Sequence, residues 1–207
     1  MGGRGGGSGR GGGGAAAPRQ ERERTGHLSD GYVGRERSIQ MLMKETGMTR
    51  NEAETTYRAM EDYFSIGYSK IRAGKPPSEA VKGKLIDNAI KRARAFNGEI
   101  YRGIHLSSND YAQWAQGLKK GATVDMKGIS SWSSKKNVAE AFARKGTHSG
   151  QSVIFKVKST SKAVPVQHLS TFGSGEAEVL APSFAKYKVS SFTTKGNITY
   201  VNLAEVA

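Results

Sequence analysis

The chain has 207 residues, which is enough for one domain with a sizeable core and too few for two ordinary domains. It carries 32 Lys and Arg residues against 18 Asp and Glu, and this net charge of +14 favours an acidic partner such as nucleic acid, a membrane surface or a phosphorylated ligand. The lack of cysteine excludes disulfides and thiolate metal sites, and without an apolar run near the ~18 residues of a membrane span we expect a soluble protein with no signal peptide.

Residues 1–34 are predicted to form a disordered Gly/Arg-rich tail, followed by one domain over residues 35–207. The first segment, MGGRGGGSGRGGGGAAA, has no large apolar side chain, so it cannot bury enough surface to offset the entropy of ordering its backbone. Arg and Gly at this spacing resemble segments that bind RNA loosely, which implies a weak nucleic-acid contact. A flexible linker or an expression remnant is the more ordinary explanation.

Helices are predicted in the first part of the domain, residues 35–97. RSIQMLMKET ends at Gly47, and Thr49 with Glu52 forms a capping box for a second helix that ends at Gly74. The apolar face of this second helix is Ala53, Tyr57, Met60 and Phe64.

A third helix is predicted with Ser78 as N-cap and Phe96 as its last residue. Its apolar side is Val81, Leu85, Ile86, Ala89 and Ile90. Its other face is basic. We interpret that face as solvated rather than as a nucleic-acid site, because no aromatic residues are interleaved with the charges.

Strands dominate residues 98–207, which follow a turn signal at Asn97-Gly98. The strand-like segments are 99–106, 122–134, 151–159, 176–182, 186–192 and 197–206. Short helices are expected over 109–118, capped by Ser108, and over 135–144, capped by Ser134. Helices first and strands afterwards indicate the α+β class rather than a doubly wound parallel sheet.

The sequence lacks the residue patterns of several common kinds of functional site. His27, His105, His148 and His168 are scattered without ligand spacing, so no metal site is predicted. The GxSxG pattern of a serine nucleophile is absent. The GSGE run at 173–176 precedes a strand rather than a helix, so it does not predict a phosphate-binding loop.

Polar residues at strand positions are the remaining candidates. Arg102 lies in an apolar strand, where its guanidinium needs either a carboxylate or a ligand phosphate. Ser131 and Ser133 share one strand face. Glu176 and Glu178 are expected to share another, about 7 Å apart, and two such carboxylates can divide the work at a glycosidic bond.

Three short motifs in this order resemble a known family. YRG at 101–103, SWS at 131–133 before a helix ending in AFA, and EAE at 176–178 before VLAP are similar to the arginine-serine-glutamate class of mono-ADP-ribosyltransferases. This class includes clostridial-type actin-modifying toxins and domains of phage head proteins. The resemblance covers residues 95–195 and implies N-terminal helices packed on a two-sheet mixed β core that binds NAD as substrate, without a metal.

The resemblance also implies which residues bind NAD. Arg102 would hold the phosphates, with Arg144 as a second phosphate contact. Gly103 would offer backbone groups to the nicotinamide amide, and Ser133 would support the same side of the site. Phe142 would stack near the nicotinamide, although its helical position fits a core residue equally well.

The catalytic residues implied by the resemblance are Glu178, Glu176 and Ser131. Glu178 would stabilise the sugar cation as nicotinamide leaves, and Ser131 would orient it. Glu176 would hold and help deprotonate an acceptor guanidinium. Phe172, in the preceding loop, would contact the target protein, or else be a partly buried hinge residue. Trp132 departs from the small residue usual at the centre of the serine motif, which implies altered strand packing.

The function implied is transfer of ADP-ribose from NAD to an arginine of a target protein, with NAD hydrolysis as a side reaction. Two alternatives stay open, a nucleic-acid-associated virion protein with a degenerate transferase fold and a transferase that modifies nucleic acid. We expect action in the cytoplasm of a host or target cell, reached by secretion, by injection or from a virion, and no membrane partner.

Overall fold

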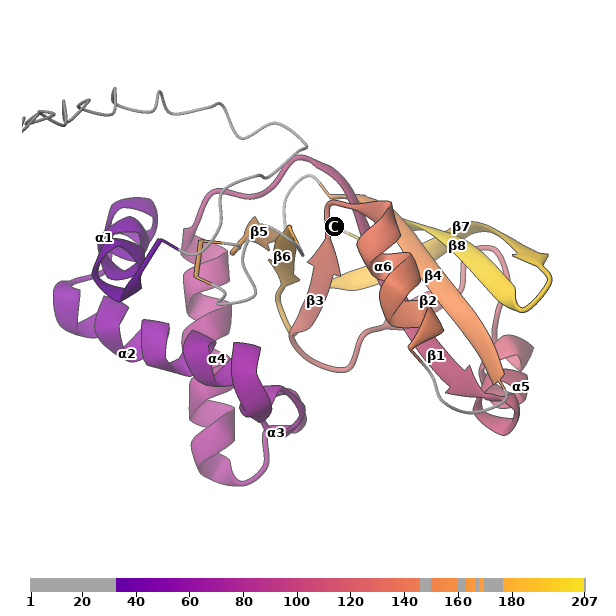
Figure 1. Ribbon diagram of the computed structural model, residues 1–207, viewed down its shortest axis with the longest axis horizontal. Coiled ribbons are helices and arrows are strands. Elements are labelled where there is room, and N and C mark those ends of the chain that lie inside the picture. The colour runs from indigo at the N-terminus through magenta and orange to yellow at the C-terminus, as the bar shows by residue number, and fades with distance from the viewer. Residues whose placement is uncertain (1–32, 146–149, 160–162, 167, 170–176, 207) are drawn as a thin grey trace, which may run out of the picture.

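The computed structural model describes residues 33–145, 150–159, 163–166, 168–169 and 177–206. The predicted tail lies outside these residues except for its last two positions. Glu176 and Phe172 also lie outside them. Figure 1 shows the first four α-helices gathered at one end of the molecule and most strands at the other.

The helical part is confirmed, with corrected boundaries. Its elements are α1 (Arg35–Thr46), α2 (Arg50–Asp62), the π-helix η1 (Tyr63–Gly67), α3 (Tyr68–Ala73) and α4 (Pro77–Arg92). Gly47 ends α1 in the left-handed conformation and the Thr49–Glu52 capping box opens α2, as predicted. The predicted second helix is interrupted by η1, a kind of turn that is frequent at functional sites.

The third predicted helix was placed wrongly at both ends. It begins at Pro77 rather than after Ser78, because proline suits the first helical position, where no N–H is needed. It ends at Arg92, and Phe96 is buried beyond it in the strand core. Val81 is 57% exposed and does not face the core.

The β-rich part contains two further helices among its strands. The elements are β1 (Gly98–Ser107), α5 (Ser108–Gln116), β2 (Thr123–Asp125), β3 (Ser130–Ser133), α6 (Lys136–Arg144), β4 (Gly150–Ser159), β5 (Val164–Pro165), β6 (Glu178–Ala181), β7 (Lys186–Lys195) and β8 (Ile198–Glu205). Within the described residues the strands join in the order β2-β7-β8-β4-β1-β3-β6-β5, with β4 and β8 parallel and the other neighbours antiparallel. The α+β class with a mixed sheet is therefore confirmed.

The predicted two-sheet core corresponds to two halves of this sheet. One half is β2-β7-β8-β4-β1 and the other is β3-β6-β5, and a single residue pair, Tyr101 with Ser133, joins β1 to β3. Leu180 of β6 belongs to the core shared with the helices, whereas Val179 belongs to the core shared with the first half. Strand β6 thus lies between the two cores, which explains why all four of its residues are buried.

Three local expectations in the β-rich part were also wrong. The predicted strand 122–134 divides into β2 and β3 at a turn where Lys127 and Gly128 have φ of 52° and 103°. The capping side chain of α5 is Ser107, whose hydroxyl accepts from Asp110 N, rather than Ser108. The residue before α6 is Lys135, so Ser134 is not its cap.

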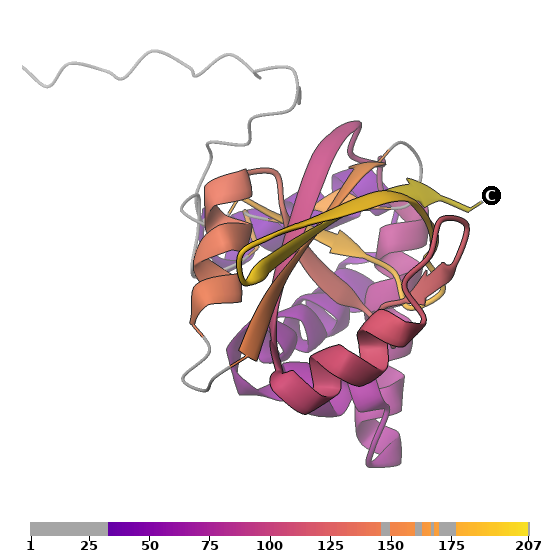
Figure 2. The same cartoon turned by 90° about the vertical axis from the view of Figure 1, so that its right-hand side faces the viewer.

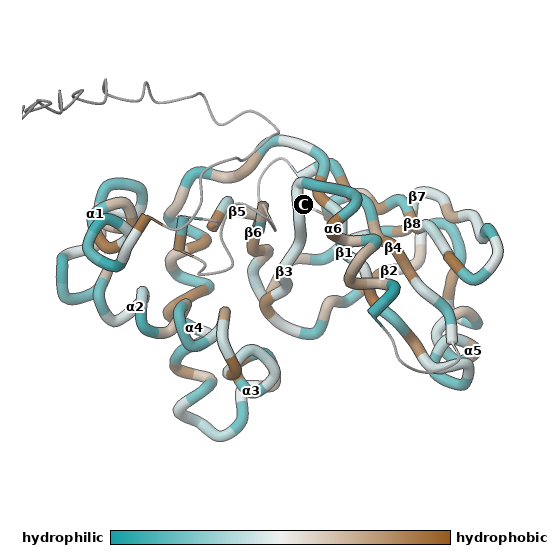
Figure 3. The backbone as a smooth tube through the Cα atoms, in the orientation of Figure 1, coloured by the Kyte–Doolittle hydropathy of each residue, from teal (hydrophilic) through white to brown (hydrophobic). Residues whose placement is uncertain are grey.

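Helices cover this half of the molecule unevenly. In Figure 2, α6 and α5 lie on opposite sides of the twisted strands. Trp114 of α5 packs edge-on against Phe155 of β4 in the strand core, with ring centres 6.0 Å apart. The outer sides of α1 and α2 are largely hydrophilic (Figure 3).

No helix in the described ranges is long and apolar enough to cross a bilayer.

Candidate active site

A cavity of about 480 Å³ lies where the helical part meets the strands, a volume typical of ligand sites. The strand wall consists of Tyr101, Arg102, Gly103, Ser131, Trp132, Ser133 and Glu178. The helical wall consists of Tyr63, Phe64, Ser65, Tyr68 and Arg72. Val138, Ala139, Phe142 and Lys145, from α6 and the residue after it, complete the lining.

Strands β1 and β3, which both line the cavity, pair at one position only. Arg102, next to that position, reaches across the gap, and its Nη1 donates to the carbonyl oxygen of Ser131 at 2.5 Å. No ion pair of Arg102 occurs among the described residues, so the structure does not support the alternative in which Arg102 serves a structural ion pair. Its guanidinium is held by a neutral carbonyl.

The cavity is electrostatically positive. Burial, together with the charge of nearby Arg72, lowers the pKa of Arg102 to about 10. Arg72 is itself held by Met126, whose carbonyl oxygen accepts from its Nη2 at 2.5 Å. Lys145 adds a third cation, and Glu178 is the only carboxylate among the lining residues of the described part. An anionic ligand would relieve this repulsion.

Ser131 is bonded to the helical wall. The hydroxyl groups of Tyr63 and Ser131 are 3.2 Å apart, and Tyr63 also donates to the carbonyl oxygen of Ile129 at 3.2 Å. Tyr63 is 3% exposed, and this burial raises the pKa of its phenol. The first residue of the π-helix therefore fixes the serine that begins the SWS motif.

Trp132, the large residue in the middle of the SWS motif, fits because it packs into the strand core. The ring of Trp132 lies 5.3 Å from that of Tyr187, and its indole N–H donates to Ser130 Oγ at 3.0 Å. Ser133 is 5% exposed, accepts from Lys135 N at 3.0 Å, and pairs with Glu178 across β3 and β6. The expected change of packing is thus local to the core side of β3.

Glu178 is the first residue of β6, is 7% exposed and lines the cavity. The preceding residue, Ala177, has φ of 44°, a left-handed conformation that costs a non-glycine residue about 1–2 kcal/mol. Strand β6 therefore starts at Glu178 rather than at residue 176, and the expected alignment of Glu176 with Glu178 concerns a residue outside the described ranges and stays a prediction. Strained backbone of this kind concentrates at functional sites.

Gly103 and Phe142 form the contact between β1 and α6. A Cβ on Gly103 would lie 1.7 Å from the carbonyl oxygen of Ala139, so only glycine allows this approach. Phe142 is 42% exposed and lines the cavity, which removes the alternative of a core role. Lys145 Nζ lies 4.4 Å from the centre of the Phe142 ring. Arg144, also exposed, is not among the lining residues, and its predicted phosphate contact stays a prediction.

The helical wall was not predicted from the sequence. The segment YFSIGYSKIR was expected to be part of one amphipathic helix, with Phe64 on its core face. The available signal was the density of tyrosine and arginine on a segment that also carries Ile66, which is 89% exposed. In the described ranges no three His, Asp or Glu side chains gather as a metal site.

The sequence profile of the family described as NAD:arginine ADP-ribosyltransferase matches residues 36–207. No curated protein matches the chain. Three solved structures share the fold. The ADP-ribosyltransferase Vis of Vibrio splendidus, in complex with agmatine, is 19% identical with a TM-score of 0.63, over 84% of this chain and 86% of Vis. The C3 exoenzyme of Clostridium limosum is 19% identical with a TM-score of 0.60, over 81% and 91%. Exoenzyme S of Pseudomonas aeruginosa, bound to carba-NAD and human 14-3-3 protein beta, is 14% identical with a TM-score of 0.58, over 83% and 88%.

Proposed function

The chain belongs to the NAD:arginine ADP-ribosyltransferase family, and from this premise we propose that it transfers the ADP-ribose of NAD to the guanidinium of an arginine on a target protein. The observation that carries the proposal is the convergence of Arg102, Ser131 and Glu178 on one cavity. Three short motifs spread over the β-rich part thus meet at a single site.

The cavity suits NAD as a substrate. Its strand wall presents Arg102, which is destabilised by burial and by Arg72, and a pyrophosphate would supply the missing anion. Phe142 and Tyr68 offer partly exposed aromatic faces for a nicotinamide or adenine ring. Gly103 brings the β1 backbone to the cavity without a side chain in the way.

Glu178 performs the central electrostatic step in this proposal. The bond between the nicotinamide nitrogen and the ribose C1′ breaks, nicotinamide leaves with the electron pair, and positive charge develops on the ribose. A buried carboxylate at the cavity stabilises this charge where water is largely excluded. Ser131, fixed by Tyr63, keeps the β3 side of the cavity in register with β6, which carries Glu178.

Arginine is the proposed acceptor. A guanidinium nitrogen bonds to C1′ and loses one proton, which needs a carboxylate because the group has a pKa above about 12. Glu176 takes this role, and Phe172 contacts the target; both lie outside the described residues. Support comes from the family and from the complex of Vis with agmatine, a small guanidine compound. When water replaces the acceptor, the same site hydrolyses NAD.

The place of action is the cytoplasm of a target cell in this proposal, because the fold neighbours include a type III effector, XopAI of Xanthomonas axonopodis.

The test is mass spectrometry of a protein lysate after incubation with NAD and the full chain. We expect ADP-ribose on arginine side chains and release of nicotinamide. Label found only on asparagine, cysteine or threonine would refute the arginine acceptor and leave the fold assignment intact. Label that yields to nuclease and resists protease would favour the nucleic-acid alternative, and no nicotinamide release with any acceptor would favour a degenerate enzyme.

A further inference from the structure

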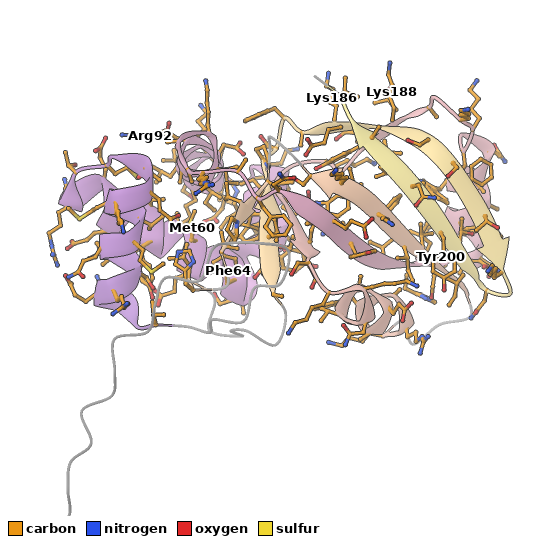
Figure 4. The ribbon with its side chains drawn as sticks, turned by 90° about the horizontal axis from the view of Figure 1, so that it is seen from above. Met60, Phe64, Arg92, Lys186, Lys188 and Tyr200 are labelled. Atoms are coloured by element: carbon orange, nitrogen blue, oxygen red, sulfur yellow. The ribbon has the colours of Figure 1, made fainter. Side chains whose placement is uncertain are left out.

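One face of the larger sheet half is open to solvent. The strands β1, β4, β7 and β8 place alternate residues on this face and bury the residues between them in the strand core. Val157, Val189 and Leu203 are examples of the buried residues. On the outer face, α6 packs against Gly103 and Ser152, and its Lys136 lies over the Tyr200 ring, so the open part is the end that carries Lys158 and Lys188. In Figure 4, the side chains of Lys186 and Lys188 point away from the strands at one edge of the molecule.

The open face is basic. Toward the β2 edge, its outward charged residues are Lys156, Lys158, Lys186, Lys188, Glu99 and Asp125. Glu99 is engaged by Lys156 at 2.6 Å and by the hydroxyl of Tyr101 at 2.6 Å. Asp125 accepts from Lys127 N at 2.7 Å. Glu99 is therefore engaged by Lys156, whereas Asp125 lies directly opposite Lys186 in the β2–β7 ladder.

The free cations of this face lie in neighbouring rows of the ladder. Lys158 pairs with Glu99, and Lys188 pairs with Ala204 on the strand between β4 and β7. On β8, Ala204 follows Leu203, and Leu203 is the ladder partner of Val157 on β4. Lys158 on β4 and Lys188 on β7 therefore lie on either side of Ala204, and their backbones are about 10 Å apart, or two strand spacings. None of Lys158, Lys186 and Lys188 has an ion pair within 4.0 Å among the described residues.

The basic face (Lys158, Lys186 and Lys188) is continuous with the cavity. Tyr101 lines the cavity and is also an outward residue of β1, one row from the Glu99–Lys158 pair. A protein bound to the basic face would therefore extend over the cavity mouth. Four lysines (Lys156, Lys158, Lys186 and Lys188) against two acids (Glu99 and Asp125) leave this part of the face net positive.

We propose that the basic face docks an acidic surface of the target protein and so presents its acceptor arginine to the cavity. This inference rests on the proposed transfer to a protein. Three lysines within one patch attract carboxylates and steer their approach, and each pair adds a modest contribution.

The test uses the full chain and two synthetic peptides, each with one arginine. One carries a run of Asp and Glu beside it, and the other has Asn and Gln in their place. At low salt we expect the KM of the acidic peptide to be about fivefold lower, and we expect this preference to disappear in the Lys158→Glu, Lys188→Glu double variant. A milder double variant with Gln at both positions should lose part of the preference. Modification of agmatine should be unchanged in both variants.

A matched control carries the same charge change at Lys84 and Lys91, two exposed lysines of α4, and should keep the full preference. Equal KM values for the two peptides in the unmodified chain, or a preference that survives in the double variant, would overturn the proposal. The proposal is also overturned if the two peptides have equal KM values while the double variant loses affinity for a DNA duplex, because the basic face would then bind nucleic acid.

A second readout separates this inference from the proposed function. If neither peptide nor agmatine is modified, the arginine acceptor is refuted, yet fluorescence anisotropy of the labelled acidic peptide still tests the docking. Binding at low salt that is lost in the double variant and kept in the α4 control supports the basic face as the docking surface. Binding that is equal in all three proteins contradicts it.

Discussion

The strand wall and the helical wall hold their polar groups in different ways. Arg102, Ser131 and Glu178 each stand on a strand whose ladder fixes the backbone. Tyr63 and Arg72 stand on η1 and α3 and reach carbonyl oxygens of the loop before β3 through their side chains. The candidate catalytic and NAD-binding side chains thus stand on strands with a fixed backbone, whereas the side chains of the helical wall stabilise the β3 side of the cavity by hydrogen bonds across it.

The largest expected effect tests the strand wall. Glu178→Gln keeps the shape of the side chain and removes its charge, so nicotinamide release should fall about a thousandfold, or ~4 kcal/mol. The rate is measured with saturating NAD, and the melting temperature serves as the control for folding. A variant that keeps more than a tenth of the activity would remove Glu178 from the mechanism.

A second change keeps the charge of the strand wall and alters its geometry. Arg102→Lys loses the planar fork that can hold a phosphate by two bonds, and kcat/KM for NAD should fall about a hundredfold, or ~2.7 kcal/mol. We expect most of the loss in KM. An unchanged KM for NAD would show that Arg102 does not hold the phosphates.

The rigidity of the strand wall is tested by Gly103→Ala. The new Cβ would meet the carbonyl oxygen of Ala139 at 1.7 Å and Ala143 N at 2.9 Å, so α6 must move, and stability should fall by about 2 kcal/mol. Gly117→Ala is the matched control, since its nearest contact is an ordinary 3.6 Å. Equal free energies of unfolding for the two variants, measured in urea, would mean that the β1–α6 contact is loose.

The smallest expected effect tests the helical wall. Tyr63→Phe removes the hydroxyl shared with Ser131, and kcat should fall about fivefold, or ~1 kcal/mol, for transfer and hydrolysis alike. KM for NAD should stay nearly constant because the strand wall is intact. A loss of stability with no change in kcat would leave Tyr63 only a packing role.

The same contrast explains what the sequence could predict. Helix starts and ends at Gly47 and Thr49 depend on neighbouring residues, and the predicted strands 99–106, 151–159, 186–192 and 197–206 coincide with β1, β4, β7 and β8 to within three residues at each end. The strand wall carries motifs whose order is visible along the chain. Tyr63 meets Ser131 across 68 residues, and no local pattern encodes that contact.

The remaining errors have local physical causes that a pattern of apolar residues does not contain. Ala177 adopts a left-handed backbone although alanine gives no signal for it, so β6 starts later than alternation predicted. Lys127 does the same before Gly128 and divides one expected strand into two. Gly128 is required there because a Cβ would lie 2.8 Å from the carbonyl oxygen of Arg72.

The central claim is that NAD binds between the two walls, with its phosphates on the strand wall. A crystal structure of the full chain with carba-NAD, the analogue bound in the exoenzyme S complex, tests this most directly. The account predicts the pyrophosphate within hydrogen-bonding distance of the Arg102 guanidinium and the nicotinamide ribose facing Glu178. An analogue bound elsewhere, or bound in the cavity without contact to Arg102, would contradict it.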